Sequence, residues 1–303
     1  MASWGATPGL ERADMALRVG VHPNNLHLLL AQHWPGAFAA LDAAFVSYPE
    51  GRDTGRLLAA GQFDLGGTGS TPPIIAQVSG ADVIYLAASA PRPANGAILV
   101  GKNAAIKTVP DLAGRRIALL DGSFHTYLLA RVLEAEGLAL KDVTRVELAP
   151  VPSRAALLAG EVDAWIAMAP HLGEALASAD VRELLPCGAA IPNRSLFWTI
   201  AQRKLDPGQI DAFTAELIRV GKEIAHDHDR AARILSDLKI GGVDFPAWRK
   251  AIASRDWTIV PAGADVIAEQ QDEADTLFRH GELARRIAVQ AAARRPVAAR
   301  SAS

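Results

Sequence analysis

Short apolar segments alternate with amphipathic segments along most of the chain, a pattern typical of strands alternating with helices. The first strand, 15–21, leads through the polar loop 22–25 into an apolar helix that begins near Leu26. The same pattern predicts further strands at 44–48, 63–66, 82–88, 97–100, 116–120, 146–148 and 162–168. Further helices are expected at 53–60, 125–136, 154–159 with Ser153 as N-cap, 206–228, 231–238, 245–253 and 264–283. The sequence therefore predicts an α/β fold with a mainly helical C-terminal part.

Two stretches of the chain repeat one another at a constant offset. HLLLA at 27–31 aligns with TYLLA at 126–130, and LLAAGQFD at 57–64 aligns with ALLAGEVD at 156–163. Each match alone is weak in a chain rich in Ala and Leu, but both occur within the same order of strand, loop and helix. The repeat predicts two lobes of related architecture, with coincidence between generic βα units as the alternative.

Composition narrows the classes of protein. The 303 residues give room for roughly two domains. Because 50% of the residues are hydrophobic and the net charge is -2, the chain has neither the composition of a disordered protein nor the basic surface of a nucleic-acid binder. Cys187 is the single cysteine, so neither an internal disulfide nor a thiolate zinc cluster is expected.

The apolar runs and the chain ends bear on location. No run reaches the roughly 18 apolar residues of a membrane span. Residues 1–18 lack the continuous apolar core of a secretory leader, because charged residues interrupt them. The Ala- and Arg-rich end, 291–303, is expected to be a flexible tail, with a membrane-surface or partner contact as the alternative.

Three loops that follow predicted strands carry small polar residues suited to an anion: 22–25, 68–71 and 122–126. In open parallel sheets, ligands bind at the carboxyl ends of strands, where helix N-termini supply N–H groups and a positive dipole. The dipole gives about 0.3 to 2 kcal/mol, whereas micromolar affinity needs about 8 kcal/mol, so several loops must converge. We expect Ser123→Ala and Thr71→Ala each to weaken anion binding by about 1 kcal/mol or more, because a hydrogen bond is lost.

Each candidate also has a structural interpretation. In place of ligand binding, residues 66–73 could form a tight connection between elements, and Ser123 could cap a helix. His22 and His125 could serve in packing, and Trp165 could lie in the core. Common enzyme signatures are absent, and Pro72 occupies the third glycine position of a dinucleotide-binding motif. We therefore expect no catalytic residue, no cofactor and no metal ion.

Five stretches carry a resemblance to a known family. They are GSTPPIIAQVSGADVIYLAASAPRP at 69–93, GAILVGKNAAIKTVPDLAGRRIAL at 96–119, DGSFHTYLLARVLEAEGL at 121–138, GEVDAW at 160–165 and VIAEQQDEADTLFRHGEL at 266–283. Through them the sequence resembles the solute-binding proteins of ABC importers for aliphatic sulfonates, within the wider nitrate, sulfonate and taurine group. The resemblance extends from about Leu17 to Leu283.

The resemblance implies a two-lobed, type II periplasmic-binding-protein-like fold, with mixed sheets flanked by helices and a hinge of crossing strands. Lobe I would comprise 1–95 plus 199–290, and lobe II 96–198. A small organic anion, an aliphatic sulfonate, would bind between the lobes by hinge closure without being transformed. The resemblance also implies an ABC permease as partner, a monomer and a periplasmic location, although a cytoplasmic one stays open.

Carried over by position, the resemblance also gives a set of ligand-binding residues. They are His22, Asn24, Asn25, Glu50, Gly69, Ser70, Thr71, Arg92, Gly122, Ser123, His125, Asp163 and Trp165.

Three departures from the family pattern leave another organic anion, or a ligand with a cationic group, open, and one of them is the lack of a leader noted above. The Trp-Asp-Pro sequence that often follows VDAW is replaced by Ile166–Pro170. Glu50 stands where the family usually has small neutral residues, and its carboxylate would repel a sulfonate unless Arg52 or Arg92 neutralised it. The alternative function is an enzyme on the same scaffold, similar to sulfinate desulfinases or thiamin-pyrimidine synthases. His22 or a neighbour stands where a desulfinase has its cysteine, which disfavours thiol chemistry.

Overall fold

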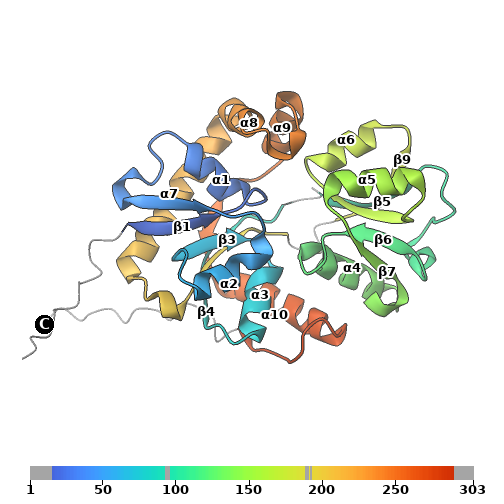
Figure 1. Cartoon of the computed structure of the whole chain (residues 1–303), viewed down its shortest axis with the longest axis horizontal. Coiled ribbons are helices and arrows are strands. Elements are labelled where there is room, and N and C mark those ends of the chain that lie inside the picture. The colour runs from blue at the N-terminus through green and yellow to red at the C-terminus, as the bar shows by residue number, and fades with distance from the viewer. Residues whose placement is uncertain (1–15, 93–95, 188–190, 192, 290–303) are drawn as a thin grey trace, which may run out of the picture.

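The computed structural model describes residues 16–92, 96–187, 191 and 193–289. The strands of this part form two separate sheets, each with helices packed on it, and the two lobes lie side by side (Figure 1). This confirms the predicted two-lobed α/β fold with mixed sheets. The predicted tail, 291–303, and the N-terminal residues 1–15 lie outside the described residues.

Lobe I contains a six-stranded sheet in the order β11-β4-β10-β3-β1-β2. Its strands are β1 (Leu17–Val21), β2 (Ala43–Ser47), β3 (Leu65–Thr68), β4 (Val83–Ser89), β10 (Leu196–Ile200) and β11 (Ile259–Pro261). Its helices are α1 (Leu26–His33), α2 (Thr54–Ala59), α3 (Thr71–Val78), α7 (Pro207–His226), α8 (His228–Asp237), α9 (Phe245–Ala253) and α10 (Ala264–Arg279). Strand β1 pairs in parallel with β2 and β3, and β10 runs antiparallel between β3 and β4.

Lobe II contains a five-stranded sheet in the order β7-β6-β8-β5-β9. Its strands are β5 (Gly96–Gly101), β6 (Arg116–Leu119), β7 (Thr144–Glu147), β8 (Ala164–Met168) and β9 (Val181–Pro186). Its helices are α4 (Phe124–Ala135), α5 (Pro150–Ala159) and α6 (His171–Ala177). Strand β6 pairs in parallel with β7 and β8, as β1 does with β2 and β3 in lobe I. Strand β5 then runs antiparallel to β8, as β10 does to β3.

Equivalent ion pairs tie β1 to the start of β3 in lobe I and β6 to the start of β8 in lobe II, and their aspartates, Asp64 and Asp163, correspond in the sequence repeat. In lobe I, Asp64 accepts from the backbone N–H of Arg18 at 3.0 Å and pairs with its guanidinium at 2.7 Å. In lobe II, Asp163 accepts from the backbone N–H of Arg116 at 2.8 Å and pairs with its guanidinium at 3.4 Å. Each arginine also donates to a glycine carbonyl: Arg18 to Gly61, which follows α2, and Arg116 to Gly160, which follows α5. The repeat is therefore a repeat of structure as well as of sequence.

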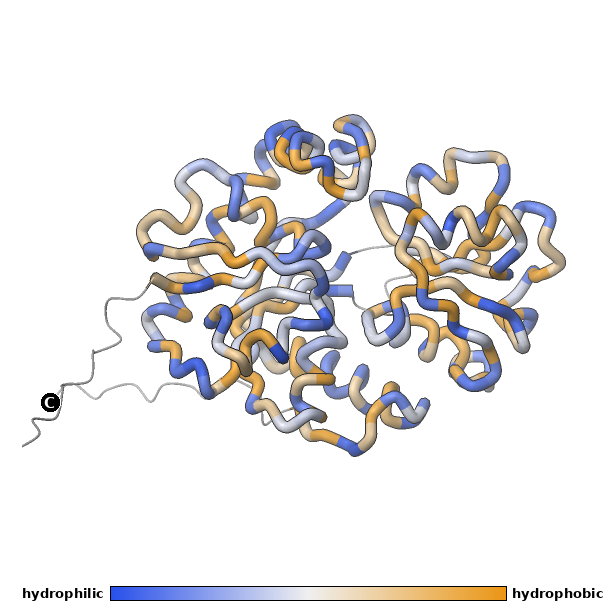
Figure 2. The backbone as a smooth tube through the Cα atoms, viewed as in Figure 1, coloured by the Kyte–Doolittle hydropathy of each residue, from blue (hydrophilic) through white to orange (hydrophobic). Residues whose placement is uncertain are grey.

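The core of each lobe lies between its sheet and the helices packed on it, and hydrophobic segments of the tube coincide with these elements (Figure 2). On one face of the lobe I sheet, α7, α8 and α9 enclose buried aromatic residues such as Phe213 and Trp248. On the other face, α10 packs on α3 of lobe I and on α4 of lobe II. The C-terminal helix therefore joins the two lobes on the side opposite α8 and α9 (Figure 1).

Polar contacts strengthen this junction. The Tyr127 hydroxyl on α4 donates to Asp272 of α10 at 3.0 Å, and Arg279 of α10 pairs with Glu134 of α4 at 2.8 Å. Beyond α10, Glu282 pairs with Arg145 of lobe II at 2.8 Å. Nowhere in the described part is there a helix long and apolar enough to cross a membrane.

The structure differs from the sequence-based expectations in four places. Residues 71–73, expected as the end of a Gly-rich loop, begin α3, because Pro72 and Pro73 occupy its first turn, where a missing N–H breaks no helical hydrogen bond. Helix α5 begins at Pro150, so Ser153 lies inside it rather than at its N-cap. Strand β10 pairs within the first sheet, so residues 196–198 lie in lobe I. Elements α6, β9, β10 and β11 were not predicted.

Candidate functional site

A cavity of about 440 Å³ lies between the two lobes. Lobe I lines it with the loops that follow β1, β2 and β3, and lobe II lines it with the start of α4 and the end of β8. Helices α1 and α4 both begin at this cavity, so their positive ends face it from opposite lobes. The cavity is thus placed where a small anion would contact both lobes at once.

Eight of the thirteen residues expected at a ligand site line this cavity. They are His22, Asn24, Glu50, Gly69, Arg92, Ser123, His125 and Trp165. The other five, which do not line it, are Asn25, Ser70, Thr71, Gly122 and Asp163.

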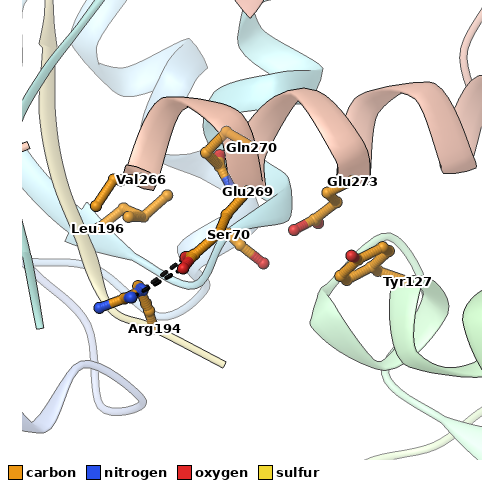
Figure 3. Close-up of a pocket in the computed structure, with 8 residues that line it drawn as sticks. All are labelled: Ser70, Tyr127, Arg194, Leu196, Val266, Glu269, Gln270 and Glu273. Atoms are coloured by element: carbon orange, nitrogen blue, oxygen red, sulfur yellow. Dashed lines mark hydrogen bonds and ion pairs between the residues drawn. The ribbon is translucent and has the colours of Figure 1, made fainter. Parts of the chain in front are cut away.

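Four of those five have a contact or a backbone conformation that explains their place, and Ser70 lines another cavity. Asn25 caps α1 by accepting from the Leu28 N–H at 3.1 Å. Thr71 donates to Glu273 of α10, and Ser70 lines a separate small cavity beside that carboxylate (Figure 3). Gly122 has a φ of 67°, a left-handed conformation that favours glycine. Asp163 is held by Arg116, as described above.

Ser123 and His125 form the lobe II edge of the cavity at the start of α4. The Ser123 hydroxyl donates to the Leu120 carbonyl at 2.6 Å and accepts from the His125 N–H at 3.2 Å. His125 Nδ1 accepts from the Leu120 N–H at 3.2 Å, and burial lowers the pKa of His125 to about 4. Since Nδ1 accepts in this neutral ring, the proton lies on Nε2. His125 therefore faces the cavity as a neutral donor.

His22 lies opposite, directly after β1. Its Nε2 is 3.0 Å from the Gly67 carbonyl, while Nδ1 is buried without a partner. Burial lowers the pKa of His22 to about 4, so the ring is neutral at neutral pH and donates through Nε2 to that carbonyl. His22 therefore forms part of the cavity wall as a neutral ring, with Nδ1 as a hydrogen-bond acceptor.

Arg92 and Arg255 supply the positive charge of the cavity. Both line it, and the Nε atom of each is buried without a hydrogen-bond partner. Burial lowers the pKa of Arg92 to about 10, and burial together with the charge of Arg92 lowers that of Arg255 to about 9. Both guanidiniums therefore stay protonated at neutral pH, close enough to repel one another.

A carboxylate and a third arginine lie at the loop after β2. Arg52 lines the cavity and pairs across the lobes with Glu147 at 2.6 Å, so its charge is balanced. Glu50 lines the cavity as well, with an exposed side chain. The concern that Glu50 would repel an anion is therefore reduced by its access to solvent, which screens its charge.

Several lining residues were missed by sequence reasoning: Asn193, His171, Trp248 and Arg255. Trp248 and Arg255 come from the helical C-terminal part, which no strand-end rule points to. Together with Trp165, Trp248 gives the cavity two aromatic side chains, although the Trp-Asp-Pro sequence of the resembled family is absent.

The described residues give no basis for metal or thiol chemistry. No group of three or more His, Cys, Asp or Glu in this part of the chain is placed to hold a metal ion. Cys187 is 4% exposed, and burial raises the pKa of its thiol to about 12, so the thiolate nucleophile is scarcely populated at neutral pH.

Comparison with known proteins agrees with this geometry. The family described as NMT1/THI5 like matches residues 37–184. A protein of Escherichia coli (strain K12), named for aliphatic sulfonate binding, is 31% identical over 276 residues, covering 89% of this chain and 86% of the relative. The fold and the cavity therefore define a two-lobed solute-binding protein. By this identity and coverage, the chain belongs to the aliphatic sulfonate-binding protein family.

Solved structures show the same relationship. The periplasmic aliphatic sulphonate binding protein SsuA from Escherichia coli matches with a TM-score of 0.83 and 29% identity, over 93% of this chain and 92% of that chain. The alkanesulfonate-binding protein SsuA from Xanthomonas axonopodis pv. citri, bound to MOPS, matches with a TM-score of 0.80 and 29% identity, over 92% and 97%.

The enzyme alternative is not favoured. The desulfurization enzyme DSZB has a TM-score of 0.65 and 16% identity, which is a likeness of fold alone. The relatives of higher identity are binding proteins, and the chain is accordingly a binding protein rather than an enzyme.

Proposed function

We propose that this protein captures a small organosulfonate in the cavity between its lobes and delivers it to a membrane permease of an ABC importer. The observation that carries the proposal is the cavity itself, which both lobes line and which holds positive charge from Arg92 and Arg255. The E. coli relative is named for aliphatic sulfonates, and the Xanthomonas protein was solved with the sulfonate MOPS.

Different residues that line the cavity bind different parts of the ligand. Arg92 attracts the sulfonate by charge, and the N–H groups at the start of α4 and the His125 Nε2–H donate to its oxygens. Trp165 and Trp248 contact the organic part of the ligand, which sets the size of substituent that the cavity accepts.

Closure of the lobes is the proposed mechanism of capture. A ligand that touches both lobes stabilises the closed arrangement by the contacts that only this arrangement provides. The α4–α10 junction stays in contact during closure and acts as the pivot, while the opposite side opens.

The experiment is a calorimetric titration of the purified protein with ethanesulfonate, butanesulfonate and MOPS. Ethanesulfonamide, which has similar shape and no charge, is the matched control. We expect saturable binding of one sulfonate per chain and no binding of the sulfonamide. Absence of binding by every sulfonate, or chemical conversion of any of them, would overturn the proposal.

The cellular setting of this protein is proposed with the function. E. coli SsuA is described as periplasmic. We propose the same compartment here, with the protein acting as a monomer that meets its permease and does not bind nucleic acid. Fractionation of cells that express the full gene, followed by immunoblotting, tests the compartment.

A further inference from the structure

Two positive charges in the cavity wall lack a carboxylate to balance them. Arg92 follows β4, and Arg255 lies between α9 and β11. Within the described residues, neither forms an ion pair, and the Nε of each is buried without a partner. Arg92 donates to the Ser195 hydroxyl, which is neutral. Both side chains line the same cavity.

This imbalance is unusual in its surroundings. Buried arginines are normally paired, because an isolated charge loses its hydration. Nearby, Arg194 follows that rule and holds Glu269 through two hydrogen bonds of 2.6 and 2.8 Å. Arg52, on the same cavity, pairs with Glu147. Arg255 lies over the Trp257 ring, 5.9 Å from its centroid, and Arg92 contacts the neutral Ser195, so no carboxylate among the described residues balances either charge.

The other titratable groups of the cavity do not supply the missing charge. Burial keeps His22 and His125 neutral, and His171 has a lowered pKa for the same reason. Glu50 is exposed and forms no ion pair within the described residues. Bound to a ligand with one negative charge, the two arginines would keep one uncompensated charge in the cavity wall.

A guanidinium presents a planar fork of N–H groups that matches one acidic group, so two guanidiniums match two such groups. We infer that the cavity prefers a sulfonate that carries a second acidic group, a sulfocarboxylate, with Arg92 and Arg255 each holding one of its acidic ends. This inference rests on the proposed function and names the class of sulfonate. The carbon chain between the two groups would lie against Trp165 and Trp248.

The test compares three ligands by calorimetry at constant ionic strength: 3-sulfopropanoate, 3-sulfopropanamide and propanesulfonate. The amide has nearly the shape of the carboxylate but one charge fewer. We expect 3-sulfopropanoate to bind at least about tenfold more tightly than the amide. In Arg255→Gln this ratio falls to about twofold or less, because one fork is lost.

Arg56→Gln is the matched control variant, because Arg56 is exposed, pairs with Asp53 and does not line the cavity. It keeps the full preference. The thermal midpoint of each variant shows whether it folds. If Arg255→Gln does not fold, the affinity ratio of 3-sulfopropanoate to 3-sulfopropanamide in the wild type tests the inference by itself.

The outcomes separate this inference from the proposed function. If propanesulfonate and the amide bind as tightly as 3-sulfopropanoate, the inference is overturned and the proposed function stands. A preference that survives both Arg92→Gln and Arg255→Gln also overturns the inference. If no sulfonate binds, whereas succinate does, the proposed function fails and the inference fails with it.

Discussion

Arg52 of lobe I reaches across to Glu147 of lobe II, with Nη1 2.6 Å from Oε1. The same nitrogen lies 3.3 Å from the Asp121 carbonyl, which also belongs to lobe II. Since Arg52 lies beside the cavity and Glu147 ends β7, this pair joins the lobes at the edge of the cavity. The pair is a direct link between the two lobes, and under the proposed closure mechanism it would add to the stability of the closed arrangement.

Glu147→Gln should weaken ligand binding without touching the cavity, because the closed state loses its cross-lobe ion pair. Both side chains are more than 40% exposed, so solvent screening limits the loss to about 1 kcal/mol or less, roughly fivefold in affinity. Calorimetry with butanesulfonate at low and high salt measures it. The difference between wild type and variant shrinks at high salt.

Arg56→Gln serves as the control for that prediction, since its ion pair with Asp53 lies within lobe I. Its affinity stays at the wild-type value. An equal loss in both variants would mean that the cross-lobe pair plays no part in closure.

Thr71→Val should lower stability and leave affinity unchanged, against the expectation drawn from the sequence. The Thr71 hydroxyl donates to buried Glu273 and does not line the cavity. Removing that donor costs about 1 to 3 kcal/mol of unfolding free energy.

Ser123→Ala is the comparison at the cavity, where loss of the α4 cap near His125 weakens affinity by about 1 kcal/mol. Denaturation by urea and calorimetry read the two effects. Weaker binding by Thr71→Val would return Thr71 to the ligand site.

Glu273→Gln should change how stability depends on pH. Burial, with a smaller contribution from Asp272, raises the pKa of Glu273 to about 7, whereas an exposed glutamate has 4.5. Between these values the folded protein binds the extra proton, so the free energy of unfolding of the wild type falls as pH rises through this window. The full shift corresponds to about 3 kcal/mol, which the glutamine variant does not lose.

Urea denaturation at acidic and alkaline pH, on either side of this window, measures that difference, with Glu161→Gln, an exposed position, as control. The advantage of Glu273→Gln over wild type grows toward alkaline pH. Parallel pH profiles for all three proteins would show that Glu273 titrates normally.

Sulfonate affinity should be nearly constant from about pH 6 to about pH 8, because His22 and His125 at the cavity stay neutral in that range. Burial holds the pKa of both His22 and His125 near 4, so neither gains a proton there. Titrations in buffers without sulfonate groups test this. An affinity that rises several-fold toward the acidic end would show that a histidine becomes protonated when the anion binds.

The parts of the fold that the sequence could predict are those with a complete local pattern. An apolar run, a polar loop and an amphipathic helix mark β1 with α1 and β6 with α4, and the structure has them within a few residues. Helix α3 was missed because its prolines and the glycines before it look like a loop. Strand β10, LFWTI, has a short apolar run that local periodicity alone does not distinguish from a buried helix segment.

The site could be predicted only where it follows strand ends. His22, Ser123 and His125 were found because loops at the carboxyl ends of parallel strands converge. The sequence does not show in which direction a loop side chain points. Asn25 was expected to bind the ligand, but in the structure its side chain caps α1. Arg255 comes from the far end of the chain, where no local pattern marks it, and only the folded structure brings it to the cavity.

A crystal grown with 2-bromoethanesulfonate shows whether a sulfonate binds in the cavity between the lobes, because anomalous scattering locates the bromine. We expect one bromine site per chain inside the interlobe cavity, beside Trp165 or Trp248, with the sulfonate on Arg92 or Arg255. A cavity without bromine at saturating ligand, or bromine bound only outside it, would show that the cavity is not the sulfonate site.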